Sequence, residues 1–258
     1  MDQLTAPDGT RIAHQATGTG PPVVLVVGAF CDRTSTADLT EVLADGFTVH
    51  EYDRRGRGAS GDTAPYDVQR EIEDLTAVLA AAGDAPFVYG HSSGAALALE
   101  TAAAGVPMSG LVVYEAPYTA EDDGSGGSDE LLQRLRDRLA AGDTDGAAAA
   151  FLGTAGAPPE VVEMMRSGPG WPRMCALAPT LVYDVLLCNG GRVPTERLAR
   201  IDVPTLALAG GVSAPWAVRS ATAIAAAVPG ATQSVVPGQH HGIPGAVLAP
   251  LLQAAFTP

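Results

Sequence analysis

The residue best placed to do chemistry is Ser92, which stands at the centre of a Gly-x-Ser-x-Gly pattern over residues 90–94. A short apolar run, 85–89, precedes this pattern, and a stretch rich in helix-forming residues, 95–102, follows it. This order predicts a strand, a sharp turn and a helix, with the serine at the turn. Such a turn raises the hydroxyl at the C-terminal end of a sheet and aims the next backbone amide at the group under attack. The alternative is a Gly/Ser turn in a parallel sheet with no catalytic role.

The rest of the chain predicts the sheet that such a serine needs. Residues 23–27 are continuously apolar, which indicates a strand buried on both faces, as in a parallel sheet. Further strands are predicted, with helices between them, at 47–52, 111–114, 204–209 and 233–236. Strands that alternate with helices predict an α/β fold with a doubly wound, mostly parallel sheet. Ligands of such sheets bind beyond the carboxyl ends of the strands.

Several polar residues directly follow predicted strands, namely Ser92, Glu115, Ser213 and His241. Because the carboxyl ends of parallel strands meet at one edge of the sheet, we expect these side chains to gather there. His14 and His50 lie within strand-like segments instead, and we expect them to be structural.

The stretch 120–200 interrupts the alternation of strands and helices. Leu131 and Leu135 share one helix face, and the later apolar patches of this stretch lack strand alternation. We therefore predict a helical insertion at 120–200 in a core domain made of residues 1–119 and 201–258.

Composition argues against several kinds of partner. The formal net charge of −14 disfavours nucleic acid and anionic membranes, which both require a positive protein surface. Three cysteines without a CxxC pair predict neither a disulfide framework nor a zinc site, and they favour a reducing compartment. No signal-peptide pattern opens the chain, and no apolar run approaches the roughly 18 residues of a membrane-spanning helix. We therefore expect a cytoplasmic protein.

Three motifs in the expected order resemble the α/β-hydrolase superfamily, over nearly the whole chain. Residues 52–60 resemble the loop after that family's fourth strand, 90–94 its nucleophile elbow, and 236–241 its terminal histidine loop. More particularly, the chain is similar to cap-bearing serine hydrolases of the actinobacterial type. The resemblance implies a helical cap over the pocket and chemistry that uses no cofactor and no metal.

By this resemblance Ser92 is the nucleophile, and a histidine of the last loop takes its proton. His240 and His241 both qualify, and we choose His241 because it matches the family's G-x-x-H ending. His240 is then expected at the surface or the pocket rim. His91, inside the elbow, is expected to pack beneath the turn.

The third member departs from the usual family pattern. Ser213 occupies the place after the seventh strand where many members carry an aspartate, and a serine cannot stabilise an imidazolium by charge. Glu115 is the natural substitute, because it ends the strand after the serine's helix and keeps the order Ser, acid, His. Asp184 is the alternative acid. Glu115 could instead be a structural carboxylate that binds loop amides.

The oxyanion hole needs two backbone amides, each worth about 10²- to 10³-fold in rate. The resemblance assigns them to Ser93 and to Phe30, whose ring would also form a wall of the pocket. Further pocket residues are expected at Trp171, Met174, Tyr183 and Trp216. Those in the insertion could equally form its own core. The arginines of the 52–60 loop, Arg54, Arg55 and Arg57, are expected to brace it rather than bind phosphate.

The resulting prediction is a serine hydrolase that cleaves an ester, thioester or lactone of a mostly apolar small molecule through Ser92, His241 and Glu115. The irregular place of the acid leaves two alternatives on the same fold. One is a cyclase or isomerase that tailors natural products, and the other is a non-catalytic ligand-binding protein. The partner in each case is a small molecule, and the sequence leaves the oligomeric state open.

Overall fold

The computed structural model describes residues 1–119 and 128–256. Within these residues, eight strands form one sheet in the order β1-β2-β4-β3-β5-β6-β7-β8. The strands are β1 (Asp2–Thr5), β2 (Arg11–Thr17), β3 (Pro22–Val26), β4 (Thr48–Tyr52), β5 (Phe87–His91), β6 (Gly110–Tyr114), β7 (Thr205–Gly210) and β8 (Thr232–Val236). β2 pairs antiparallel with both β1 and β4, while β3 to β8 pair with their neighbours in parallel. The predicted α/β fold with a mostly parallel sheet is therefore confirmed.

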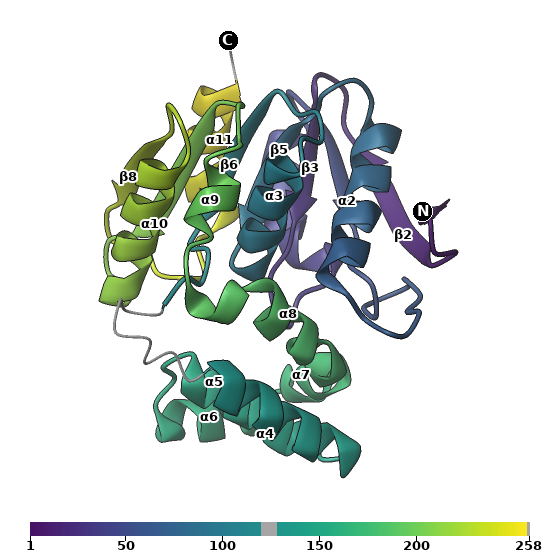
Figure 1. The fold of residues 1–258 in the computed structure, drawn as a ribbon, viewed down its shortest axis with the longest axis vertical. Helices are drawn as coiled ribbons and strands as arrows, with labels where there is room; N and C mark the ends of the chain where they lie inside the picture. Colours follow the sequence, from purple (N-terminus) through teal and green to yellow (C-terminus); the bar gives the residue numbers. More distant parts are fainter. Residues whose placement is uncertain (120–127, 257–258) are drawn as a thin grey trace.

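Helices cover both faces of the sheet, as Figure 1 shows. These helices are α1 (Ala37–Leu43), α2 (Val68–Ala82), α3 (Ser93–Ala103), α10 (Pro215–Ala227) and α11 (Gly245–Phe256). α1 and α11 bury their apolar side chains with Val23 and Leu25 of β3. α2, α3 and α10 do so with Val24 and Val26 on the opposite face. β3 is thus buried on both sides, which explains its continuous run of valine and leucine.

Between β6 and β7 the described residues contain helices and turns but no strand. We call these the insertion helices: α4 (Ser128–Ala140), α5 (Thr144–Thr154), α6 (Pro159–Arg166), α7 (Trp171–Leu177), α8 (Leu181–Leu187) and α9 (Thr195–Leu198). Short 3₁₀ turns occur at Arg33–Thr36, Ala178–Thr180 and Asn189–Gly191. In Figure 1, α4 to α7 lie beyond the lower ends of the strands, with α8 between them and the core.

The insertion helices have an apolar core of their own, built around Leu135, Ala147, Trp171 and Leu181. The division of the chain into core and insertion at 120–200 stays a prediction, and its first boundary falls among residues 120–127, outside the described residues. None of the helices in the described part of the chain has both the length and the apolar character needed to cross a bilayer.

Candidate active site

Ser92 occupies a strained turn between β5 and α3, with a φ of 55° and a ψ of −126°. The neighbouring glycines are required by close contacts with the backbone. A Cβ at Gly94 would lie 2.2 Å from the carbonyl oxygen of Val26, and one at Gly90 would lie 2.7 Å from the Cα of Ala95. Positive φ in a residue other than glycine persists only where the surroundings enforce it, and it is frequent at active sites.

Glu115 and His241 form a hydrogen-bonded pair, although 126 residues separate them in sequence. His241 Nδ1 lies 2.6 Å from Glu115 Oε2. The other carboxylate oxygen, Oε1, accepts a hydrogen bond of 2.8 Å from the backbone N–H of Gly210. The Glu115 side chain is fully buried, while that of His241 is 48% exposed. The Glu115 carboxylate is therefore held in place at the carboxyl end of β7, whereas the His241 ring is half exposed to solvent.

The electrostatic environment keeps Glu115 ionised. Burial acts to raise the pKa of this carboxyl group, but the hydrogen bonds from His241 and the Gly210 amide outweigh it and hold the pKa below its usual value. An ionised carboxylate at Nδ1 favours the tautomer that carries its proton on that nitrogen. The Nε2 atom of His241 is then left free to accept a proton.

His241 lies against the residue that precedes the nucleophile. Its ring makes an edge contact with the ring of His91, with centroids 4.9 Å apart, and a tilted contact with Trp216 at 6.2 Å. The hydroxyl of Tyr114 donates a hydrogen bond of 2.6 Å to the backbone oxygen of His240, which anchors the loop. Sequence reasoning missed this role of Tyr114, which appears in the sequence only as an apolar strand residue.

The structure forms no hydrogen bond between the Ser92 hydroxyl and the His241 ring within the described residues. Catalytic hydrogen bonds in unliganded enzymes are often long and tighten only when substrate binds.

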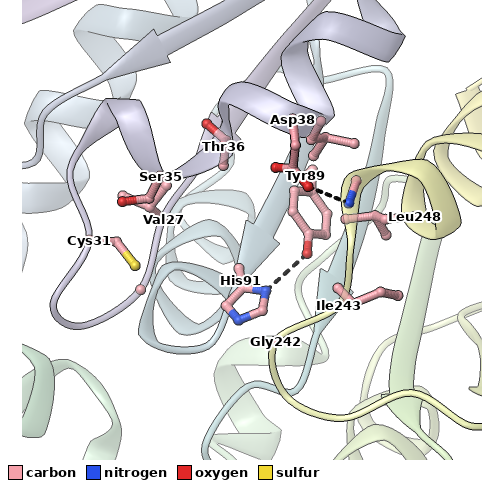
Figure 2. Close-up of a pocket in the computed structure, with 13 residues that line it drawn as sticks. Val27, Cys31, Ser35, Thr36, Asp38, Tyr89, His91, Gly242, Ile243 and Leu248 are labelled. Carbon is pink, nitrogen blue, oxygen red and sulfur yellow. Dashed lines mark hydrogen bonds between the residues drawn. The ribbon is translucent and has the colours of Figure 1, made fainter. Parts of the chain in front are cut away.

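His91 packs beneath the turn. Its ring stacks on Tyr114, with centroids 5.5 Å apart, and its Nδ1 lies 3.1 Å from the hydroxyl of Tyr89. Figure 2 shows this contact at one side of a cavity between the loop after β3 and the start of α11. Burial, and then the nearby His241, lower the pKa of His91 to about 3. His91 is therefore neutral near pH 7.

The two proposed oxyanion donors belong to separate segments, the start of α3 and the loop after β3. Ser93 begins α3, and Phe30 lies in the loop after β3 with a φ of 58°. Gly28 of the same loop passes so close that a Cβ there would lie 2.7 Å from the Cβ of Ser92. The Phe30 ring meets Phe151 of α5 edge to face, with centroids 5.5 Å apart.

The other residues expected in the pocket have different surroundings. Trp171 is buried, and its Nε1 donates to Asp145 at 2.8 Å within the insertion helices. Tyr183 stacks on Tyr66 at 3.9 Å between ring centroids. Met174 is partly buried against the same apolar cluster as Phe30. The pocket role of all five residues stays a prediction; of them, Trp216 is the one whose ring contacts His241.

Asp184 makes no contact with His241. Its carboxylate is fully buried and accepts hydrogen bonds from Arg54, Arg57 and Ser93. The arginines of the loop after β4 thus brace buried structure. Among the described residues, no group of three or more His, Cys, Asp or Glu side chains could hold a metal ion.

Comparisons with known proteins identify the family and the fold. Residues 23–254 match the model of the alpha/beta hydrolase family. The chain belongs to the α/β-hydrolase family. It is 44% identical to an alpha/beta hydrolase from Sphaerobacter thermophilus of known structure, with a TM-score of 0.94 over 99% of this chain and 100% of that one. A hydrolase from Pseudomonas aeruginosa is 25% identical, with a TM-score of 0.77 over 98% and 96% of the two chains.

One further relative of this α/β-hydrolase is the uncharacterized hydrolase YraK of Bacillus subtilis, which is 34% identical over 96 residues. That match spans 36% of this chain and 35% of YraK, about a third of its length. The fold is also shared with an esterase from Rhodococcus sp. at 22% identity, with a TM-score of 0.68 over 93% of this chain and 91% of that one. The family assignment makes the chain an α/β-hydrolase enzyme and leaves its substrate open.

Proposed function

We propose that this α/β-hydrolase is a cofactor-independent serine hydrolase that cleaves an ester, thioester or lactone of a mostly apolar small molecule. Ser92 is the nucleophile, His241 the general base and Glu115 the acid that orients it. The observation that carries the proposal is the 2.6 Å contact between His241 Nδ1 and the buried carboxylate of Glu115. Glu115 directly follows the carboxyl end of β6, and Ser92 directly follows the carboxyl end of the neighbouring strand β5.

In the first half of the reaction, the Ser92 oxygen attacks the carbonyl carbon of the substrate while its proton moves to His241 Nε2. The carbonyl oxygen becomes an oxyanion, which the backbone amides of Phe30 and Ser93 stabilise. The tetrahedral intermediate collapses, and the leaving alcohol or thiol takes the proton from His241. An ester between the acyl group and Ser92 remains.

In the second half, water attacks the acyl-enzyme and gives its proton to the same His241 nitrogen. The oxyanion forms again at the two amides, and its collapse releases the carboxylic acid and returns the proton to Ser92. Glu115 stays ionised throughout and stabilises the imidazolium that forms twice in each cycle. Its lowered pKa supports this role.

The surroundings of the site support a substrate with an apolar acyl or alcohol group. Phe30 and Phe151 provide aromatic surface beside one proposed oxyanion donor, and Trp216 provides it beside His241. A long or branched apolar substituent would gain free energy from burial there, at about 25 cal/mol per Å².

Labelling with a fluorophosphonate, read by intact-protein mass, tests the nucleophile. We expect one adduct on the wild-type chain, none on Ser92→Ala, and strongly slowed labelling of His241→Ala. His240→Ala is the matched control, because the neighbouring histidine is exposed and Tyr114 binds its backbone rather than its ring. Equal labelling of His240→Ala and His241→Ala would refute the assignment of the base.

A panel of p-nitrophenyl esters of increasing acyl length, with thioesters and lactones, then defines the substrate class. We expect kcat/KM to rise with apolar length until the pocket is filled. A chain that is labelled at Ser92 but hydrolyses no member of the panel would instead favour cyclase or isomerase chemistry. A chain that is not labelled at all would favour ligand binding without catalysis.

A further inference from the structure

A buried polar cluster lies behind the oxyanion hole and includes a carboxylate from the insertion helices. The cluster consists of Arg54, Arg57, Glu71, Ser93 and Asp184. Its charged side chains are at most 1% exposed, and its two guanidinium groups balance its two carboxylates. Asp184 is the member contributed by α8, and the others come from the core.

Asp184 holds one half of the oxyanion hole directly. Its Oδ1 atom accepts a hydrogen bond of 2.6 Å from the hydroxyl of Ser93, whose backbone N–H is one proposed donor to the oxyanion. Arg54 Nη1 donates to the same Ser93 oxygen at 3.1 Å and to Asp184 at 2.9 Å. The first residue of α3 is thereby tied to a residue of α8.

Asp184 holds the other half through Arg57. Arg57 Nη2 donates to Asp184 Oδ1 at 2.7 Å, while Nη1 of the same guanidinium donates to the backbone oxygen of Gly28 at 2.5 Å. Nη1 also lies 3.4 Å from the backbone oxygen of Cys31. Gly28 and Cys31 flank Phe30, the second proposed donor, so Arg57 fixes the segment that carries its amide.

We infer that Asp184 is a positioning residue that holds both amide donors of the oxyanion hole in register and makes their geometry depend on the docking of α8. The inference rests on the proposed function. Asp184 touches neither the substrate nor His241, and it acts only through Ser93 and Arg57. Donors must lie within a few tenths of an ångström of the developing oxyanion to stabilise it, and a displacement of about 1 Å can cost 10²-fold in rate.

Charge is essential to this arrangement. A single oxygen of Asp184 accepts three hydrogen bonds, two of them from guanidinium groups. Asparagine has the same shape, but its oxygen is neutral. Asp184→Asn therefore leaves the buried guanidinium groups of Arg54 and Arg57 with a single carboxylate in the cluster, that of Glu71. Removing one partner of a buried ion pair is strongly destabilising, because the remaining charge is left buried without compensation. The guanidinium of Arg57 is then free to shift, and the Gly28 carbonyl with it.

The test compares Asp184→Asn with Asp62→Asn in ester hydrolysis. Asp62 accepts a hydrogen bond of 2.7 Å from the hydroxyl of Tyr183, so the same substitution there also removes the charge from a carboxylate that joins α8 to the core. That contact has no link to the oxyanion loop. We expect kcat of Asp184→Asn to fall about 10²-fold with KM changed less than about threefold, and Asp62→Asn to match the wild type.

A second readout separates positioning from general damage. An alkyl trifluoromethyl ketone adds Ser92 to its carbonyl as a hemiketal and leaves an oxyanion between the two amides. Its inhibition constant should rise in proportion to the fall in kcat for Asp184→Asn. The pH profile of kcat/KM should keep its wild-type shape, because Glu115 and His241 are untouched.

If Asp184→Asn does not fold, Ser93→Ala serves in its place. It removes the hydroxyl bound by Asp184 but retains the backbone amide, and we expect kcat and ketone affinity to fall together by about tenfold. Wild-type kcat and ketone affinity in either variant would overturn the inference while leaving the proposed function intact. A wild-type Ser92 that fails to react with fluorophosphonate would instead overturn the proposed function itself.

Discussion

Replacing Glu115 by glutamine tests the proposed acid with little change in shape. The backbone N–H of Gly210 donates to Oε1, so the amide oxygen of the new side chain would occupy that position. Its NH₂ group would then face His241 Nδ1, which lies 2.6 Å from Oε2 in the wild type. To accept that hydrogen bond, Nδ1 must give up its proton, and the neutral ring then carries its proton on Nε2. That nitrogen can no longer deprotonate Ser92.

The expected loss of activity has two parts. The charge-assisted hydrogen bond to the buried carboxylate is worth about 1.5–3 kcal/mol, and part of this is lost to solvent around the half-exposed ring. At about 1.36 kcal/mol per factor of ten, this part alone lowers kcat roughly 10- to 100-fold. The wrong tautomer adds to it, and the corresponding Asp→Asn change in a serine protease lowers kcat by about 10⁴. We therefore expect a fall of about 10³- to 10⁴-fold for Glu115→Gln.

The assay is p-nitrophenyl ester hydrolysis under saturating substrate, with the unfolding midpoint in urea measured on the same samples. Glu100→Gln is the control, because it also removes a carboxylate from an ion pair, in this case with Arg197. Activity of Glu115→Gln within tenfold of the wild type, in a folded protein, would refute the role given to this residue. Glu115 would then be a structural carboxylate that holds the Gly210 amide.

Three further results are expected. Gly94→Ala should destabilise the fold by about 3 kcal/mol or prevent folding, since its Cβ meets the Val26 carbonyl, and a urea midpoint near that of the wild type would contradict this. Gly153→Ala, inside α5 with no atom within 4 Å of the new Cβ, should raise the free energy of unfolding by about 0.5–1 kcal/mol in the same assay. Burial and the neighbouring His14 lower the pKa of His50 to about 4, so the unfolded chain binds a proton below about pH 6.5 that the native chain does not. Stability should therefore fall by about 2 kcal/mol between pH 7 and pH 5, and His50→Gln should flatten that fall in pH-dependent urea titrations.

The strained backbone turn at Ser92 could be predicted, because the residues that permit it are close to it in the sequence. A serine in a strained turn needs glycines where other backbone segments approach it, and such glycines are visible in the sequence around Ser92. The edge at which Glu115 and His241 meet could be predicted because parallel strands bring their carboxyl ends together. The hydrogen-bonded pair of His14 and His50, with 2.9 Å between Nε2 and Nδ1, agrees with the structural role expected for strand histidines.

Side-chain partners across long separations could not be predicted. Apolar residues in a helix have the same spacing whether they line a pocket or pack against a neighbouring helix, and so the sequence leaves open whether Trp171 and Tyr183 line the pocket or form the core of the insertion. In the structure Trp171 binds Asp145, and Tyr183 stacks on Tyr66. Asp184 posed the same difficulty. A carboxylate in an insertion has no pattern that distinguishes a triad acid from a buried partner of two arginines.

The place of the acid along the chain is less constrained than its place in space. β6 and β7 are neighbours in register, with Tyr114 opposite Leu208, and the backbone N–H of Glu115 donates to the oxygen of Leu208. The Glu115 side chain then crosses to β7 and accepts a hydrogen bond from the amide of Gly210, the last residue of that strand. A carboxylate at the end of either strand can therefore reach the same histidine loop after β8. Because a triad acts through the geometry at the imidazole, the serine at 213 removes the usual acid without removing the function we propose for it.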